Sequence, residues 1–351
     1  MKLKKSTINN IIAYGIVIVA FVICQMSLNA GTMSRSLKGQ MIPICVYIVM
    51  AVSLNLVVGI SGELSLGHAG FMSVGAFSGA IISTWLLEGL HIENTIIRLI
   101  LSMLAGGLFA GAAGVLIGIP VLRLRGDYLA IVTLAFGEII RNVLNCLYFS
   151  LDGGRLYVSF SNPNIPGTLV VNGPAGTSGI AKIASFPMGF ALILFTLFVV
   201  MNLINSRSGR AIMATRDNRI AAEAMGINVT KYKMMAFVTS AVLAGMAGAL
   251  YGLNFSTVAA AKFKFDTSIL VLVFVVLGGI GNIWGSIIAA TLLTVLPELL
   301  RAFSDYRMLV YAIVLILVML ATNNPFIRSL FDRLIHRRKP AGNTQRGGAS
   351  E

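Results

Sequence analysis

Few residues in this chain could do chemistry, and the most unusual of them stand in a glycine-rich stretch between Leu54 and Gly79. Glycines at 59, 62, 67, 70, 75 and 79 interrupt two apolar arms, and one acid, Glu63, lies among them. Backbone that leaves a helix inside hydrocarbon must be covered by protein or must face water, and transport proteins use such broken segments beside their solutes. We therefore predict a solute path here, with these candidate path residues: Gly62, Glu63, Gly67, His68 and Gly70.

Each polar member of this stretch also has a plainer interpretation. Glu63 either faces water or finds a partner among backbone amides, because an unpaired carboxylate in hydrocarbon is costly. His68 is a residue type that more often packs or forms a hydrogen bond than binds a solute. The glycine pairs Gly75/Gly79, Gly107/Gly111, Gly114/Gly118 and Gly248/Gly252 predict close helix packing.

A second set of candidate path residues lies further along the chain. Glu138 and Arg141 are three apart, so they are neighbours on one helical face and neutralise each other. Ionisable groups inside a membrane mark functional sites by default; the alternative is that this pair locks helix packing or lies near the outer interface. Three glycines, Gly278, Gly279 and Gly281, break another apolar stretch and complete the candidate path.

Enzymatic chemistry finds little support. The chain has no Gly-x-x-x-x-Gly-Lys-Ser/Thr loop to hold a phosphate. Its three histidines, His68, His91 and His336, are scattered, and its three cysteines lie in apolar runs without CxxC spacing. No Ser/His/Asp arrangement is evident. We predict that the chain is not an enzyme and binds no metal and no cofactor.

Composition indicates a membrane protein. Of the residues, 57% are hydrophobic and 11% charged, against about 25% charged in soluble domains. The net charge of +14 raises the alternative of nucleic-acid binding. The basic residues, however, stand in tails and between apolar runs, so we predict contact with the lipid bilayer and none with nucleic acid.

Apolar runs of about 20 residues are long enough to cross a bilayer, and they predict an all-α polytopic membrane protein with about ten transmembrane helices and glycine-broken segments. With N- and C-termini both cytoplasmic, 17 of the 27 Lys and Arg residues are inside, as the positive-inside rule favours. Merging 268–299 into one crossing would put the basic C-terminus outside. Residues 1–30 also resemble a cleavable secretory signal, but we expect them to be retained. The predicted crossings are 11–28, 42–59, 67–87, 99–121, 128–149, 187–204, 234–256, 268–283, 285–299 and 308–322.

On this topology the chain has one membrane domain, 1–327, and a basic cytoplasmic tail, 328–351, which we expect to be partly disordered. The polar insert 151–187 is external and rich in turn signals without a regular period. The loop 206–233 is cytoplasmic. Within it, 218–225 is rich in helix formers, Gly226 is placed as a helix stop, and Thr230 is a candidate cap for the next helix. The plainer interpretation is an ordinary basic loop.

Several of these blocks, in order, resemble one known family. They are Leu54–Gly79, Arg123–Arg141, Val271–Gly285 with its Leu-Gly-Gly-Ile-Gly, and Arg301–Leu309. From about residue 42 to 322 the chain is similar to the permease subunits of branched-chain amino-acid ABC importers, in particular the larger, LivM type. Glu63 stands where many relatives have Gln, and Thr322-Asn-Asn-Pro-Phe326 replaces the usual Arg-Pro-x-Gly; both departures concern the solute more than the family.

The resemblance implies a multi-pass permease in the plasma (inner) membrane of a prokaryote, forming part of the path for leucine, isoleucine, valine or related small polar solutes. It implies as partners a second permease subunit of the LivH type, two ATP-binding subunits that use the ATP, and an external solute-binding protein. Ala221, Ala222 and Gly226 match the Ala-Ala-x-x-x-Gly core of the family's coupling loop, although Ile220 replaces its usual Glu. The implied ATPase-coupling residues are Arg216, Asp217, Arg219, Ala221, Ala222, Glu223 and Gly226.

Two other classes of function remain as alternatives. A stand-alone secondary transporter or channel would need ion-coordinating or proton-relay residues near the midplane, and only Glu63, Glu138 and Arg141 are available. A polytopic membrane enzyme would need a catalytic set that the sequence does not offer. Copurification of an ATP-binding subunit separates the first hypothesis from both.

Overall fold

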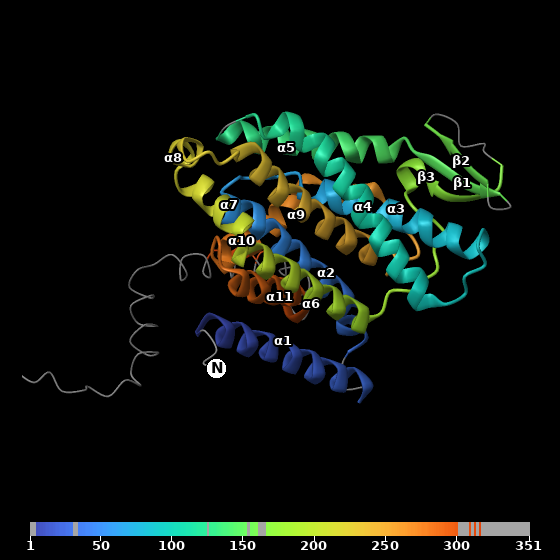
Figure 1. Ribbon diagram of the computed structural model, residues 1–351. Coiled ribbons are helices and arrows are strands. Elements are labelled where there is room, and N and C mark those ends of the chain that lie inside the picture. Colours follow the sequence, from blue (N-terminus) through green and yellow to red (C-terminus); the bar gives the residue numbers. More distant parts are fainter. Residues whose placement is uncertain are drawn as a thin grey trace, which may run out of the picture. The chain divides into compact units, whose positions relative to one another are not determined.

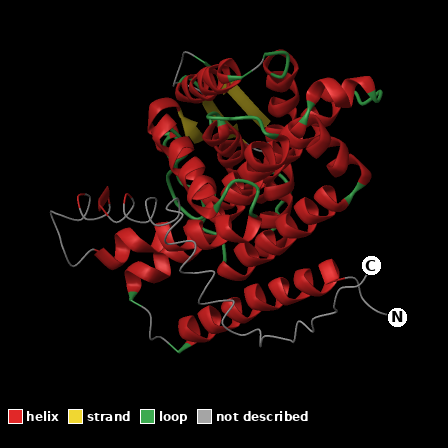
Figure 2. Ribbon diagram, turned by 90° about the vertical axis from the view of Figure 1, so that its left-hand side faces the viewer, coloured by secondary structure: helices red, strands yellow, loops and turns green. Residues whose placement is uncertain are grey.

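The computed structural model describes residues 5–30, 34–124, 126–152, 155–160 and 166–300, together with positions 309, 312, 313 and 316. Most of the described chain is helical (Figures 1 and 2). A compact unit extends over Met1–Glu298, and a second unit over Leu299–Glu351. The predicted crossing 308–322, apart from the four positions named above, and the predicted tail 328–351 lie outside the described residues.

The helices follow one another along the chain with short connections, and side-chain caps fix several of their starts. Ser34 accepts a hydrogen bond from the backbone of α2, and Asn94 caps α4. Asn228, rather than the predicted Thr230, caps α9 by accepting from the amide of Lys231 at 3.1 Å. The helices are α1 (Lys5–Asn29), α2 (Arg35–Asn55) with a π-helical turn (Leu56–Ser61), α3 (His68–Glu88), α4 (Thr95–Val121), α5 (Asp127–Asn145), α6 (Phe186–Asn205), α7 (Arg207–Asp217), α8 (Arg219–Ala224), α9 (Val229–Gly252), α10 (Phe265–Gly278) and α11 (Ile283–Leu299).

Helix α9 forms the centre of the bundle and packs against α2, α3 and α4. Glycines let the backbones approach: a Cβ at Gly75 would lie 2.0 Å from the carbonyl oxygen of Gly245, and one at Gly248 would lie 2.0 Å from that of Met72. Small residues at such contacts are what helix association in lipid requires. The predicted packing role of these glycine pairs therefore agrees with their places between α3, α4 and α9.

Among the residues that the structure describes, six helical segments are long and apolar enough to cross a membrane: Arg35–Ser61, α3, α4, Tyr128–Asn145, α6 and α9. Helix α10 has 14 residues, about 21 Å at 1.5 Å per residue, which is shorter than a hydrocarbon core of about 30 Å. Helix α11 follows after a break at 279–282, so the apolar stretch 268–299 forms two helices, as predicted, rather than one. Many large apolar side chains of α4 point outward, including Leu108 and Leu116.

The polar insert corrects one prediction. In place of turns alone, it contributes to a three-stranded antiparallel sheet in the order β2-β1-β3, with a register shift between Phe149 and Ser150. The fold is therefore mostly helical rather than all-α. The strands escaped detection because each has five residues and the central strand is buried on both faces, so its sequence does not alternate. Their bounds are β1 (Tyr148–Asp152), β2 (Arg155–Ser159) and β3 (Thr168–Asn172).

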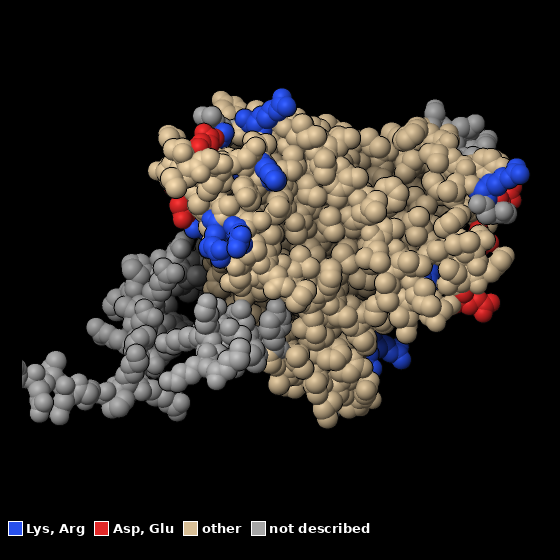
Figure 3. Space-filling view, viewed as in Figure 1, with Lys and Arg blue, Asp and Glu red and all other residues tan. Residues whose placement is uncertain are grey.

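The sheet and the short helices α7 and α8 lie at opposite ends of the bundle (Figure 1). On the face shown in Figure 3, charged side chains gather at these two ends, and the surface between them is formed by uncharged residues. An uncharged band between charged ends is the surface that a bilayer requires. The long helices thus run between two polar ends of the molecule.

Candidate functional site

The glycine-rich stretch between α2 and α3 leaves regular helix, as its glycines predict. The last turn of α2 widens into the π-helical segment Leu56–Ser61, and Gly62 then takes φ +76°, the left-handed conformation that glycine adopts without strain. Residues 62–67 are not helical, and α3 begins at His68. Of the predicted path residues, Gly62, Glu63 and Gly67 lie in this break, whereas Gly70 lies in the first turn of α3.

The two glycine-broken segments meet. A Cβ at Gly59 would lie 2.3 Å from the amide nitrogen of Gly281, in the turn between α10 and α11. Asn55, fully buried, joins the two segments: its Oδ1 accepts from the Gly281 amide at 2.9 Å, and its Nδ2 donates to the Ser286 hydroxyl at 3.0 Å. Gly279 and Gly281 have positive φ, and Gly278 packs against Gly285. The structure therefore brings Gly59, at the end of α2, against predicted path residue Gly281, whereas the predicted path glycines Gly62, Gly67 and Gly70 contact other segments.

His68 belongs to a buried polar network. Its Nε2 lies 2.8 Å from the Ser53 hydroxyl of α2, and the Ser240 hydroxyl of α9 donates to the Ser53 carbonyl at 2.6 Å. The neighbouring amide of Ala69 donates to the Ser268 hydroxyl of α10 at 3.1 Å. The network ties the start of α3 to three other helices, and this geometry agrees with the plainer interpretation of His68 as a hydrogen-bonding residue.

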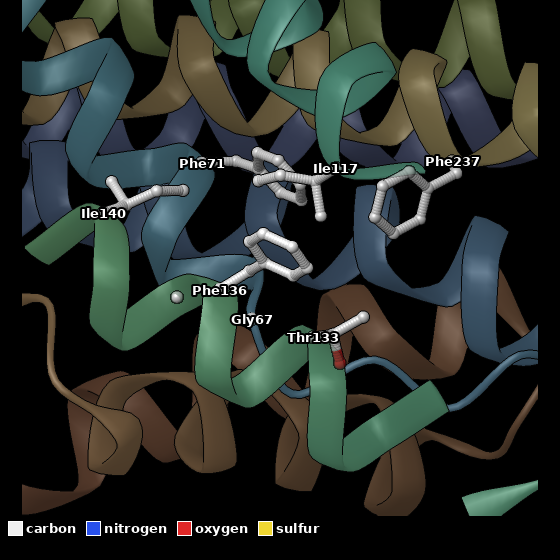
Figure 4. Close-up of a pocket in the computed structure, with 8 residues that line it drawn as sticks. Gly67, Phe71, Ile117, Thr133, Phe136, Ile140 and Phe237 are labelled. Carbon is white, nitrogen blue, oxygen red and sulfur yellow. The ribbon is translucent and has the colours of Figure 1, made fainter. Parts of the chain in front are cut away.

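The start of α3 rests directly on α5. A Cβ at Gly67 would lie 2.2 Å from the Thr133 carbonyl oxygen, and one at Gly70 would lie 3.0 Å from the Cα of Gly137. An apolar pocket beside this contact is closed by aromatic rings from three helices: Phe71, Phe136 and Phe237 (Figure 4). The absence of side chains at Gly67 and Gly70 lets the broken segment lie flush against α5.

Glu138 and Arg141 form the ion pair that their spacing predicts. The Arg141 Nε donates to Glu138 Oε2 at 2.7 Å, and both side chains are partly exposed. Glu138 also lines a second small pocket, between α5 and the starts of α3 and α10. Glu138 directly follows Gly137, which contacts Gly70, and Arg141 stands one turn further along α5. The pocket's other lining residues are Leu66, Gly70, Leu134, Gly137, Phe263, Lys264, Phe265 and Ser268.

Glu63 is partnered by a side chain that sequence reasoning did not identify. The Lys233 ammonium, in the second turn of α9, forms an ion pair with the Glu63 carboxylate, and each side chain is 13% exposed. The sequence-based expectation of a backbone-amide or water partner is thereby corrected. The sequence places Lys233 at the end of the predicted cytoplasmic loop 206–233, and no local signal connects it with a residue 170 positions away.

The loop between α6 and α9 folds as two short helices. Asn218 caps α8 by accepting from the Ala221 amide at 3.0 Å, and Gly226 follows α8 at φ +79°, as its predicted role of helix stop requires. Ala222 is buried, whereas Ala221 is exposed. The predicted charged residues pair locally: Arg216 with Asp217, and Arg219 with Glu223.

Two features of this loop were not predicted. Helix α8 presents large apolar side chains to the outside, with Ile220 81% exposed and Met225 just after it 82% exposed. Arg216 reaches the broken segment, where its Nη1 donates to the carbonyl of Gly59 at 2.9 Å. The loop and the glycine break, which the sequence treats as separate features, are therefore in direct contact.

Among the described residues, no group of three or more His, Cys, Asp or Glu side chains is placed to hold a metal ion. The cysteines that the structure describes are all free. What the described part of the site offers is positioned backbone, buried hydroxyl groups and the four ion pairs described above.

Comparison with known proteins gives a consistent result. Residues 38–319 match the family model described as the branched-chain amino acid transport system permease component. The chain is 35% identical over 309 residues to the high-affinity branched-chain amino acid transport system permease protein LivM of Salmonella typhimurium, an alignment that covers 78% of this chain and 66% of the relative. The chain thus spans slightly less than two thirds of that relative's length.

More distant relatives include proteins with other names. The ribose import permease protein RbsC of Haemophilus influenzae is 27% identical over 288 residues, an alignment that covers 78% of this chain and 81% of the relative. The high-affinity branched-chain amino acid transport system permease protein LivH of Salmonella typhimurium is 26% identical over 281 residues, an alignment that covers 78% of this chain and 88% of the relative. No significant match to a solved structure was found.

Proposed function

This chain belongs to the family of branched-chain amino acid transport system permease components, and from that premise we propose that it is a permease subunit of an ATP-binding cassette importer. In this proposal it forms part of the membrane path for leucine, isoleucine and valine, and separate subunits hydrolyse the ATP. The observation that carries the proposal is the family match, which extends over residues 38–319. The meeting of two glycine-broken segments inside the bundle supports a transport role.

The topology we propose has ten crossings, with both termini in the cytoplasm. The structure supports part of it, because α7 and α8 lie at one end of the bundle and the sheet at the other, so α6, which connects them, runs from end to end. The distribution of Lys and Arg supports the orientation in which α7 and α8 are cytoplasmic. The protein is then a multi-pass protein of a prokaryotic plasma (inner) membrane, with its small sheet on the outer face.

Helix α8 and its flanking residues are the proposed docking element for an ATP-binding subunit. Exposed apolar side chains with charged neighbours are typical of protein interfaces, and the Arg216–Asp217 and Arg219–Glu223 pairs lie close in the sequence to the exposed Ile220 and Met225. The buried Ala222 and the left-handed Gly226 hold the short helix against α9 and end it sharply. Docking here would transmit ATP-driven movement to the membrane helices.

The remaining partners follow from the same proposal. A second permease, of the kind named LivH among the relatives, completes the path, and an external solute-binding protein delivers the solute at the end that carries the sheet. The outward side of α5 supports a contact with another membrane protein, because Glu138 and Arg141 remain partly exposed there. The candidate path residues of α5 and of the broken segments would border the space between the two permeases.

The solute is the point at which the relatives differ, because ribose permeases also match. The test is to purify the tagged chain from its own membranes, measure ATP hydrolysis by the copurified complex, and reconstitute it with its solute-binding protein in liposomes. ATP-dependent uptake of leucine is the expected result. Uptake of ribose in its place would correct the solute, and uptake without ATP would replace the proposal by a stand-alone transporter or channel.

A further inference from the structure

We infer that Arg216 and Lys233 form a two-point latch between the helices that flank the ATPase-docking helix α8 and the glycine break 59–63, so that movement of α8 repositions this end of the path. The inference rests on the proposed function, since it names the residues through which the docking loop would act. It is carried by contacts between segments that are 157 and 170 positions apart in the chain.

The first point of the latch is the Arg216 guanidinium. Where α2 widens and ends, the Glu63 amide donates to the Val57 carbonyl, so the Gly59 carbonyl is left without the amide that a regular α-helix would supply. The Arg216 Nη1 takes that place at 2.9 Å, and its Nε and Nη2 donate to Asp217 at 3.0 and 2.9 Å. A cation at a helix C-terminus is also favoured by the helix dipole.

Gly62 makes room for this contact. A Cβ at Gly62 would lie 2.6 Å from Cγ of Arg216, so the arginine stem occupies the space that any side chain at 62 would fill. The positive φ of Gly62 independently requires glycine. The same residue therefore turns the chain out of the helix and receives the arginine.

The second point of the latch is the ion pair between Lys233 and Glu63. Both side chains are largely buried, so neither charge is fully hydrated, and each depends on the other for compensation. Lys233 lies on α9 after the docking helix, whereas Arg216 lies on α7 before it. The segment 59–63 is thus held by one cation from each helix that flanks α8.

The opposite side of the break explains why a movement here would matter. Gly59 also lies against Gly281 of the α10–α11 turn, so a shift of the segment changes the contact between the two broken elements. The hydroxyls of Ser61 and Ser65 are buried and have no hydrogen-bond partner in the described part of the chain. Because buried hydroxyls are normally paired, these two side chains contribute no bond that would hold the segment in its present position.

The first experiment measures leucine transported per ATP hydrolysed by the reconstituted complex. Arg216→Gln and Glu63→Gln should keep ATP-binding subunits attached but lower this ratio by about tenfold, the usual size of a coupling effect. Exchanging the charges, Glu63→Lys with Lys233→Glu, should restore the ratio to within about threefold of the unaltered protein. Arg123→Gln is the matched control, because Arg123 is an exposed cation after α4 and outside the loop.

A second measurement guards against variants that fail to fold. With the native cysteines replaced, Glu63→Cys and Lys233→Cys are introduced together and oxidised to a disulfide. The disulfide should abolish ATP-dependent uptake, and a reductant should raise uptake only to the lowered level of Glu63→Gln, because the reduced variant still lacks the ion pair. Unchanged uptake with the disulfide formed, or coupling ratios equal to that of Arg123→Gln, would overturn the latch while leaving the importer in place. An unaltered complex that shows no ATP-dependent uptake would instead overturn the proposed function.

Discussion

Adding one methyl group at the contact between α3 and α9, by the substitution Gly75→Ala, should lower the free energy of unfolding by an amount that follows from the structure. A Cβ at Gly75 would lie 2.0 Å from the Gly245 carbonyl oxygen and 2.5 Å from its Cα, whereas Cβ atoms essentially never approach within 3.0 Å of another heavy atom. Gly75→Ala therefore forces the two backbones apart by roughly 1 Å, which forfeits about a quarter to a half of the dispersion energy of the contacts that separate. Overpacking of this kind costs about 1–3 kcal/mol, and we take the upper value because backbone blocks the methyl group.

Better helix propensity offsets about 1 kcal/mol of that cost, which leaves a net loss of about 2 kcal/mol in the free energy of unfolding. Gly39→Ala in α2 is the matched control, because nothing lies within 4 Å of its added Cβ. We expect Gly75→Ala to have the lower midpoint of thermal unfolding in detergent, measured by fluorescence-detected size exclusion. Equal midpoints for the two variants would refute the packing argument.

The remaining predictions concern the turn after α8, the buried amide and the topology. Gly226→Val should lower transport while the protein stays inserted, because a β-branched residue at φ +79° is strained by at least about 1–2 kcal/mol. Asn55→Ala should destabilise the protein by about 1–3 kcal/mol in thermal unfolding, since it leaves buried partners unpaired. A membrane-impermeant thiol reagent added outside should label a cysteine at Lys182 and miss one at Arg207.

Each of these predictions has its own control. Gly179→Val is the control for Gly226→Val, because Gly179 also has a positive φ, +69°, but lies in the insert and away from α8. We expect it to leave attachment of the ATPase unchanged. Equal uptake by the two variants would contradict a special role for Gly226. Asn205→Ala removes a single local bond on an exposed side chain, and an equal loss of stability there would contradict the Asn55 argument. External labelling at Arg207 would invert the topology.

Patterns of local origin were predicted well from the sequence. Runs of about 20 apolar residues predicted the bounds of α3, α4 and α6 closely, because length in hydrocarbon is a strong constraint. They also predicted α2 and α9, but both helices begin earlier than predicted, at Arg35 and Val229. The glycines at 62 and 279 marked true breaks, because their left-handed φ disfavours every other residue type. The spacing of Glu138 and Arg141 sufficed to predict their ion pair.

Contacts of long range could not be obtained in this way. Nothing near Glu63 in the sequence indicates Lys233, and nothing near Arg216 indicates that it binds a backbone carbonyl in another segment. The sheet was missed for a different reason: each strand has only five residues, and the central strand β1, buried on both faces, lacks the alternation by which strands are recognised. The roles of the predicted path and coupling residues remain predictions, because they depend on a solute and on partner subunits.

The bond between Asn55 and Gly281 has a consequence for how the protein is made. The two residues are 226 positions apart, so Asn55 is synthesised long before the turn whose Gly281 amide donates a hydrogen bond to it. Throughout that interval its amide must be satisfied by something other than its final neighbours, because a bare amide in hydrocarbon is costly. A nascent chain that ends before α10 therefore has the Asn55 amide without its final hydrogen-bond partners. Packing of the α10–α11 turn against Asn55 is accordingly a late step of assembly.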